Sequence, residues 1–274
     1  MPVITSVLNN GQWITGGAVE PEPPATNPVA MMLNTPGATW AHRGGGTNWP
    51  EMTAHAYTNA LAAGYGCLEV SLGRTSDGVW FGVHDWTLDR TSGLTGSGWV
   101  GDLTWAQVQQ HQVILGASGA PKPYMRWEEL LTIIPPRTIL VVDPKDFGGT
   151  HMQEFLAMVK NSWGTHRTIF KQYGGEVAMA NLAAAAGFEH RWGHFYPADH
   201  ADGSLAANQG AWTMLGMSYN ASQTVWDAVN SYGKPTVAHI CNSLAAYTMG
   251  ISRGADMAQC ANVLDIPAVT TWLD

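Results

Sequence analysis

The chain has 274 residues, of which 45% are hydrophobic and only 12% are charged. Thirteen Lys and Arg face twenty-one Asp and Glu, which gives a net charge of −8 with no basic run, so nucleic acid and anionic membrane surfaces are poor partner candidates. The length suits one large domain, because α/β barrels commonly run to about 250 residues as a single unit.

The N-terminal residues differ in character from the rest. We interpret 1–37 as an appendage, with two short strands before a Pro-rich linker, and 38–274 as one domain. The N-terminus lacks a basic segment followed by a long apolar one, so no secretory signal is visible and we expect a cytoplasmic or virion-associated protein. No run approaches the roughly 20 apolar residues of a membrane-spanning helix. Three cysteines without CxxC spacing predict buried free thiols.

From residue 38 onward, short β-like runs alternate with helical segments. This alternation, repeated eight times, predicts an α/β fold of the (β/α)8 TIM-barrel type, with an open doubly wound sheet as the fallback. No G-x-G-x-x-G follows the first strand to support dinucleotide binding. The predicted barrel strands are 39–41, 67–72, 138–142, 168–173, 190–195, 212–217, 236–241 and 256–261, with an extra strand at 79–83. The main predicted helices are 51–63, 127–133, 152–163, 176–186, 223–232 and 244–253.

Polar side chains gather at the ends of the first four predicted barrel strands and of the extra strand. Active sites of such barrels lie at the C-terminal ends of the strands, so these side chains should meet at one mouth. Packing alone does not explain this convergence of imidazole, carboxylate and cationic groups. The residues concerned are His42, Arg43, Glu69, Ser71, His84, Asp85, Asp143, Lys145 and Lys171.

A set of short motifs resembles the glycerophosphodiester phosphodiesterase family. The motifs are the H-R-G at 42–44, the P-E at 50–51, the L-E-V at 68–70, the S-D-G at 76–78, the H-D at 84–85 and the L-D-R-T at 88–91. Weaker echoes extend the similarity to about residue 262. The resemblance implies a barrel that hydrolyses a phosphodiester, usually of a glycerol-phosphate headgroup, with a divalent cation. It also points to small or polymeric glycerol-phosphate diesters as substrates, and to a role in lipid metabolism.

The chemistry of phosphodiester hydrolysis explains why a site would contain the polar groups found at the strand ends. The diester needs positive charge on its nonbridging oxygens and a proton donor for the leaving oxygen. Arg43 and Lys145 would contact the phosphate, while His42 and His84 would act as acid and base, for which an unperturbed pKa near 6.5 is suited. In the family, the attacking group is often taken to be a hydroxyl of the substrate's own glycerol. Which histidine acts first as the acid stays open.

The expected metal site departs from the family pattern. The family has Glu-x-Asp on the second strand, whereas this chain has Glu69 and Ser71 around Val70. Hard cations such as Mg²⁺ and Ca²⁺ prefer oxygen ligands with negative charge. We therefore expect a retained but weaker divalent-cation site on Glu69 and Asp143, with Glu51 and Ser71 as further candidate ligands.

Several alternatives stay open. Asp89 and Arg90 are interpreted as a structural pair in the loop after His84. Two positions, at the rim of the barrel and on the surface, are given equal weight for four further histidines, namely His190, His194, His200 and His239. The loss of one carboxylate at Ser71, the N-terminal appendage and the low charge suggest a second function, because they resemble features of phosphodiesterase-like domains on phage tail proteins. In it, a catalytically weakened barrel binds glycans or teichoic acid, or serves as a structural module of a phage tail, with virion tail components as partners. A third, a phospholipase acting on intact lipid, requires an exposed apolar loop, for which 92–101 offers little.

Overall fold

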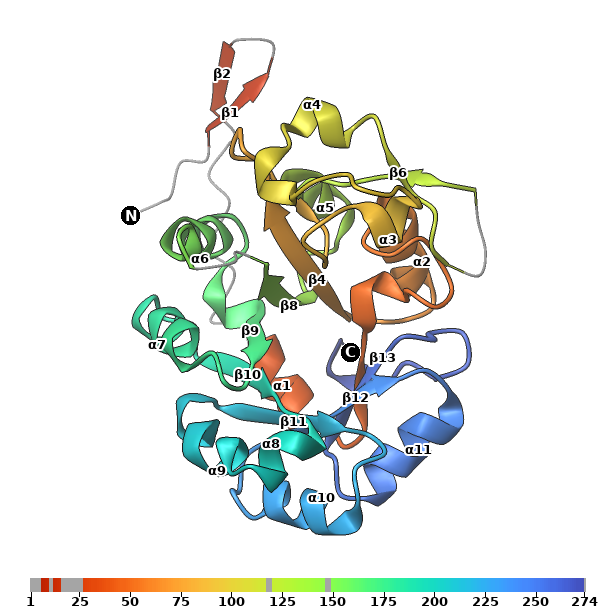
Figure 1. The fold of residues 1–274 in the computed structure, drawn as a ribbon, viewed down its shortest axis with the longest axis vertical. Helices are drawn as coiled ribbons and strands as arrows, with labels where there is room; N and C mark the ends of the chain where they lie inside the picture. The colour runs from red at the N-terminus through yellow and green to blue at the C-terminus, as the bar shows by residue number, and fades with distance from the viewer. Residues whose placement is uncertain (1–5, 10–11, 16–26, 117–119, 146–148, 274) are drawn as a thin grey trace.

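The computed structural model describes residues 6–9, 12–15, 27–116, 120–145 and 149–273. In this part of the chain, eight parallel strands form a sheet in the order β3-β13-β12-β11-β10-β9-β8-β4, and pairing of β3 with β4 closes it. Strand β5 runs antiparallel along β4. The predicted (β/α)8 barrel is therefore confirmed, and closure excludes the open sheet (Figure 1).

The barrel strands lie within two residues of their predicted ranges. Because a parallel barrel buries both faces of each strand, a strand reads as a continuous apolar run, and all six residues of β8 are buried. The strands are β3 (Ala38–Ala41), β4 (Cys67–Arg74), β8 (Ile139–Pro144), β9 (Thr168–Tyr173), β10 (His190–His194), β11 (Met214–Ser218), β12 (Thr236–Cys241) and β13 (Met257–Cys260). The shorter strands are β1 (Ser6–Asn9), β2 (Gln12–Thr15), β5 (Trp80–Gly82), β6 (Gln112–Val113) and β7 (Lys122–Pro123).

The helices that connect successive barrel strands lie outside the ring of strands (Figure 1). Helix α2 begins three residues later than predicted, because the Thr53 side chain accepts a hydrogen bond from the Ala56 N–H and Met52 has a left-handed φ of 56°. Glu51 therefore precedes the helix. The other outer helices are α5 (Trp127–Ile133), α6 (Met152–Ser162), α7 (Val177–Ala185), α10 (Gln223–Asn230) and α11 (Leu244–Ser252), with α2 at Ala54–Ala62. Shorter helices are α3 (Asp89–Ser92), α4 (Trp105–Val108), α8 (Pro197–Ala201) and α9 (Ser204–Asn208).

Helix α1 (Pro28–Leu33) lies in the stretch interpreted as linker. Asn27 caps it by accepting hydrogen bonds from the N–H groups of Val29 and Ala30. Val29 and Met32 are fully buried in one cluster with inward-facing residues of the barrel strands. Short apolar segments of this kind carry no clear periodicity, so the sequence alone did not indicate a helix. The boundary at residue 37 stays a prediction, but the packed core of the barrel includes residues from this stretch.

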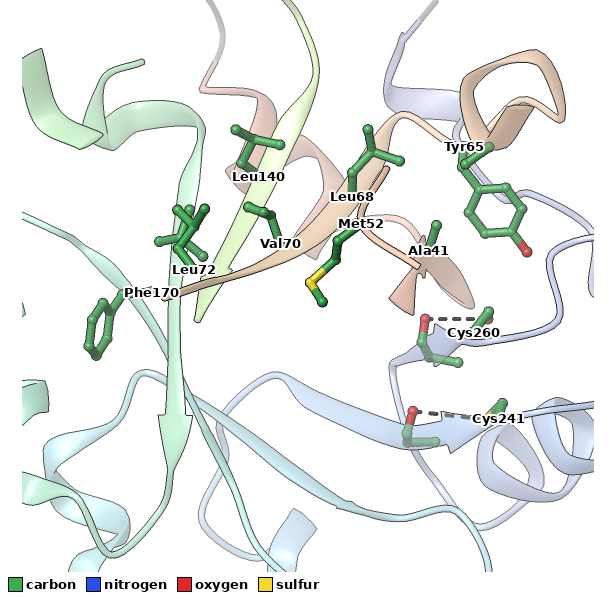
Figure 2. Close-up of a cluster of buried hydrophobic side chains, with 14 of the residues drawn as sticks. Ala41, Met52, Tyr65, Leu68, Val70, Leu72, Leu140, Phe170, Cys241 and Cys260 are labelled. Carbon is green, nitrogen blue, oxygen red and sulfur yellow. Dashed lines mark hydrogen bonds between the residues drawn. The ribbon is translucent and has the colours of Figure 1, made fainter. Parts of the chain in front are cut away.

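Two apolar layers lie on either side of the strands. The inner layer fills the barrel and includes Trp40 and Trp192. The outer layer lies between strands and helices, and Figure 2 shows part of it. The three cysteines are buried free thiols, as predicted. The Cys241 and Cys260 thiols lie 3.9 and 3.6 Å from the carbonyl oxygens of Ala238 and Ala258 (Figure 2). Within the described ranges, no helix has both the length and the apolar character needed to cross a membrane.

Candidate active site

The C-terminal ends of the barrel strands surround a pocket of about 160 Å³. Four of the residues predicted to act in catalysis or phosphate binding line it, namely His42, Arg43, His84 and Lys145. The predicted metal ligands do not line it, and Glu69, Ser71 and Asp143 are fully buried on the neighbouring strands β4 and β8. The remaining lining residues are Lys171, Trp192, His194, Tyr196, His239, Ile240 and Gln259.

His42 follows strand β3 directly, in the short 3-10 turn η1 (His42–Gly44). Arg43 has a left-handed φ of 53°, and its backbone N–H donates a hydrogen bond to Glu69 Oε2 at 3.2 Å. The same oxygen lies 3.5 Å from His42 Nε2. Burial, followed by the positive charges of Arg43 and Lys171, holds the pKa of His42 well below its usual value of 6.5. His42 is therefore neutral at pH 7 and can accept a proton.

A chain of ion pairs holds His84 at the pocket. Its Nδ1 lies 2.7 Å from Asp85 Oδ1, and the Arg90 guanidinium donates to the other oxygen of Asp85. Burial raises the pKa of Asp85, but the hydrogen bonds from His84 and Arg90 lower it well below its usual range overall. Burial also lowers the pKa of His84, against the effect of Asp85. The carboxylate thus orients the imidazole, which leaves Nε2 to exchange a proton.

Arg90 also binds Glu51, one of the candidate metal ligands. Arg90 Nη2 lies 2.7 Å from Glu51 Oε1, and Arg43 Nη1 lies 3.3 Å from both carboxylate oxygens. Arg90 does not pair with Asp89 as expected, because the Asp89 carboxylate instead accepts the backbone N–H groups of Gly96 and Ser97. Asp89 therefore fixes the loop, while Arg90 joins the H-D motif to the P-E motif.

Two lysine side chains form ion pairs with Glu69 and Asp143, the other carboxylates among the candidate metal ligands. Lys171 donates a hydrogen bond to Glu69 and lies 3.1 Å from Asp143 Oδ2. Lys145 Nζ lies 2.9 Å from the same Asp143 oxygen, which also accepts the Ser71 hydroxyl at 3.3 Å. Burial alone would lower the pKa of Lys171, but the charges of Asp143 and Glu69 raise it overall. For Asp143 the two lysines outweigh burial and hold its pKa far below the usual range.

His194, His239 and Gln259 complete the opposite wall of the pocket. His239 Nε2 lies 3.0 Å from the Phe195 carbonyl oxygen. His194 Nδ1 and Gln259 Nε2 are buried without a hydrogen-bond partner among the described residues. The sequence left the two histidines undecided and did not single out Gln259. The signal that identifies them is the two-residue alternation of inward positions along each barrel strand. His190 lies at the other end of β10, where its Nε2 is 3.3 Å from Asn27.

The buried histidines predict that the protein loses stability as pH falls below 6.5. Burial lowers the pKa of His239 to about 4. Between pH 6.5 and 4, His239 is therefore protonated in the unfolded chain but neutral in the folded chain. Stability therefore falls with decreasing pH in this window, by about 1.4 kcal/mol per pH unit for one such group. Urea unfolding across this range should show a shallower slope for His239→Gln than for the wild type. Equal slopes would contradict a neutral His239 in the folded state.

Comparison with known proteins agrees with the fold and indicates a family. The model of the glycerophosphoryl diester phosphodiesterase family matches residues 42–176, which contain all eight candidate site residues. A rat glycerophosphodiester phosphodiesterase 1 is 44% identical over 70 residues, which is 26% of this chain and 20% of the relative. An Arabidopsis thaliana relative is 33% identical over 106 residues, 37% of this chain and 31% of its own. The chain thus spans about a fifth to a third of these curated relatives.

Solved structures agree over most of the chain. A candidate glycerophosphoryl diester phosphodiesterase from Silicibacter pomeroyi superposes with a TM-score of 0.74 at 18% identity, covering 90% of this chain and 96% of its own. A phosphodiesterase from Oleispira antarctica, solved with the product sn-glycerol-3-phosphate, gives 0.66 at 16% identity, with 87% and 97% coverage. These structures support the barrel fold, and the family model matches the part of the chain that contains the H-R-G and H-D motifs. The chain belongs to the glycerophosphoryl diester phosphodiesterase family.

Proposed function

We propose that this protein hydrolyses a phosphodiester bond of the glycerophosphodiester type, with His42 and His84 as its acid and base. The observation that carries the proposal is the convergence of the His42 and His84 imidazoles and of three cationic side chains on one pocket, namely Arg43, Lys145 and Lys171. A phosphodiester monoanion is attracted by this charge, and its reaction requires both proton transfers. The family match supports the same reaction class.

The proposed reaction assigns one proton transfer to each histidine. An attacking oxygen, from water or from a neighbouring hydroxyl of the substrate, forms a new bond to phosphorus while the bond to the headgroup oxygen breaks. One imidazole removes the proton of the attacking oxygen, and the other, in its protonated form, gives a proton to the departing oxygen. Arg43 and Lys145 hold the nonbridging oxygens, where negative charge increases in the transition state.

A larger cleft of about 410 Å³ adjoins this pocket through Lys145 and provides room for a headgroup. Asp85, Trp86 and Trp99 also line it. The indole rings of Trp86 and Trp99 have centroids 4.6 Å apart and are 47% and 51% exposed. We propose that the glycerol phosphate binds in the smaller pocket and that the headgroup leaves through this cleft.

The family generally uses a divalent cation, and Glu69, Asp143 and Ser71 are the groups that would hold one here, with Asp143 Oδ1 free of hydrogen bonds among the described residues. Such a cation would lower the charge on the phosphate when bound. The donor set fits Mg²⁺ or Ca²⁺ poorly, because both carboxylates are already paired with ammonium groups and the third donor is an uncharged hydroxyl. The fourth candidate, Glu51, is held by two arginines.

The alternative functions stay predictions without support from the comparisons. The family model and the solved structures compared above are described as phosphodiesterases, and these descriptions do not support a phage tail module with virion partners or binding of teichoic acid. The catalytic groups of the resemblance are present and meet at the pocket, which favours an enzyme over a binding module.

Product release from a panel of glycerophosphodiesters tests the proposal. Substrates with ethanolamine, choline and inositol headgroups should each be assayed for sn-glycerol 3-phosphate and for the free headgroup. We expect turnover of at least one, with His42→Gln/His84→Gln as the inactive control that corrects for contaminating hydrolases. Absence of turnover on every diester by folded protein, both with and without added Mg²⁺, Ca²⁺ or Mn²⁺, would overturn the proposed function.

A further inference from the structure

The ammonium group of Lys171 lies between the two carboxylates that were predicted to hold a metal. It donates a hydrogen bond to Glu69 and is 3.1 Å from Asp143 Oδ2. Glu69 and Asp143 are fully buried, and Lys171 is only 5% exposed. A buried carboxylate needs a cationic partner, and here both carboxylates share the same one. The position expected for a metal ion on these oxygens is thus taken by a side chain of the protein.

The register of the barrel strands dictates this position. Ser71 on β4 pairs with Asp143 on β8. On the next strand, Val142 pairs with Phe170, so Asp143 and Lys171, the residues that follow, lie side by side. Because alternate residues of a barrel strand face inward, Ser71, Asp143 and Lys171 project into the interior in one row. Lys171 also pairs with Trp192 on β10, and its Nζ lies 5.3 Å from the centre of that indole ring.

The charges around this row leave little attraction for a divalent cation. The carboxylates of Glu69 and Asp143 contribute two negative charges, and the ammonium groups of Lys145 and Lys171 contribute two positive charges. The residue expected to add a third carboxylate is Ser71, whose hydroxyl donates to Asp143 instead of offering a charge. A metal ion bound between Glu69 Oε1 and Asp143 Oδ2 would have to displace Lys171, and the displaced ammonium would remain in the buried site as a like charge.

We propose that Lys171 is the resident cation of this site and takes over the electrostatic role of the divalent ion, so that the protein works without a metal. Lys171 lines the pocket beside His42 and Arg43, which places its charge where a nonbridging phosphate oxygen would bind. The replacement of a carboxylate by Ser71 fits this role, because one ammonium carries half the charge of a divalent ion and needs fewer negative partners. The role in catalysis rests on the proposed function, whereas the metal-free site does not.

Metal binding by the wild-type protein gives a test that is independent of turnover. The full chain should be stripped with a chelator and then titrated with Mg²⁺, Ca²⁺ and Mn²⁺ while its melting temperature is measured. We expect no saturable increase, whereas a site at about 100-fold excess over its dissociation constant would raise the melting temperature by roughly 5 °C. Such an increase in the wild type would overturn the proposal.

A pair of substitutions should create the metal site that the wild type lacks. In Ser71→Asp/Lys171→Gln, a third carboxylate replaces the hydroxyl and the ammonium is removed, so this variant should bind Ca²⁺ or Mn²⁺ with a saturable rise in melting temperature. Lys160→Gln, which removes an exposed lysine bound to the Ala186 carbonyl, is the matched control and should behave as the wild type does. If the double variant does not fold, the titration of the wild type still decides the question.

Activity provides the second measurement. If a glycerophosphodiester is turned over, excess chelator should leave the rate of the wild type within about twofold of the untreated rate. Loss of activity with chelator and its recovery with a metal would overturn the proposal even if no thermal shift were seen. If no diester is turned over, the proposed function fails, but the metal titration still supports or overturns Lys171 as the resident cation.

Discussion

Replacing either His42 or His84 with glutamine is expected to lower kcat on a glycerophosphodiester by about 10²- to 10⁴-fold, because each variant loses one of the two required proton transfers. Glutamine keeps a side chain of similar size that can form hydrogen bonds but does not exchange a proton near neutral pH. KM should change much less than kcat, since Arg43, Lys145 and Lys171 still line the pocket. Steady-state kinetics on the best substrate of the panel measures both constants.

His55→Gln provides a matched control for these two variants. His55 lies in helix α2, and its ring nitrogens contact Asn59 in the same helix, away from the pocket lining. Its rate should be that of the wild type, and all three variants should have similar circular dichroism spectra. If His84→Gln kept more than about a tenth of the wild-type kcat, His84 would not carry a proton transfer in the rate-limiting step.

The sequence predicted the strands and their polar ends well because these features are local. A buried parallel strand is a short apolar run, and a histidine or carboxylate just after it is visible without knowledge of the fold. The H-R-G and H-D motifs were therefore predicted to meet at one mouth of the barrel, and His42, Arg43 and His84 do line one pocket there. The late start of α2 was missed because the left-handed backbone of Met52 has no signature in a non-glycine residue.

The sequence predicted much less well which side chains would pair across strands. Whether Lys171 reaches Glu69 depends on the register of β8 and β9, and neither the spacing nor the composition of the chain determines that register. For the same reason, the sequence did not show that Arg90 joins Asp85 to Glu51, although all three residues were noted. The departure at Ser71 was the only hint that the metal site differs. The physical meaning of Ser71 became clear only once the structure placed Lys171 between Glu69 and Asp143.

Trp192 lines the pocket and pairs with Lys171 across strands β10 and β9. Trp192 is fully buried in the barrel interior, where its ring meets Trp40 edge-on with centroids 5.2 Å apart. It fits because the neighbouring strand carries Gly216, where an added Cβ would lie 2.3 Å from the indole nitrogen. The same ring lines the pocket and lies beside the Lys171 ammonium. Trp192 therefore connects the packing of the barrel with the position of the cation.

Trp192→Ala is expected to destabilise the protein by about 3–5 kcal/mol, because it removes the indole contacts and leaves a cavity that the closed strands cannot fill. The melting temperature should fall by roughly 10 °C in a chain of this size. Trp99→Ala is the control, since Trp99 is 51% exposed and surface substitutions usually change stability by less than about 0.5 kcal/mol. Urea unfolding of both variants measures the difference. Similar losses would show that Trp192 does not support the barrel interior, or the position of Lys171 beside its ring.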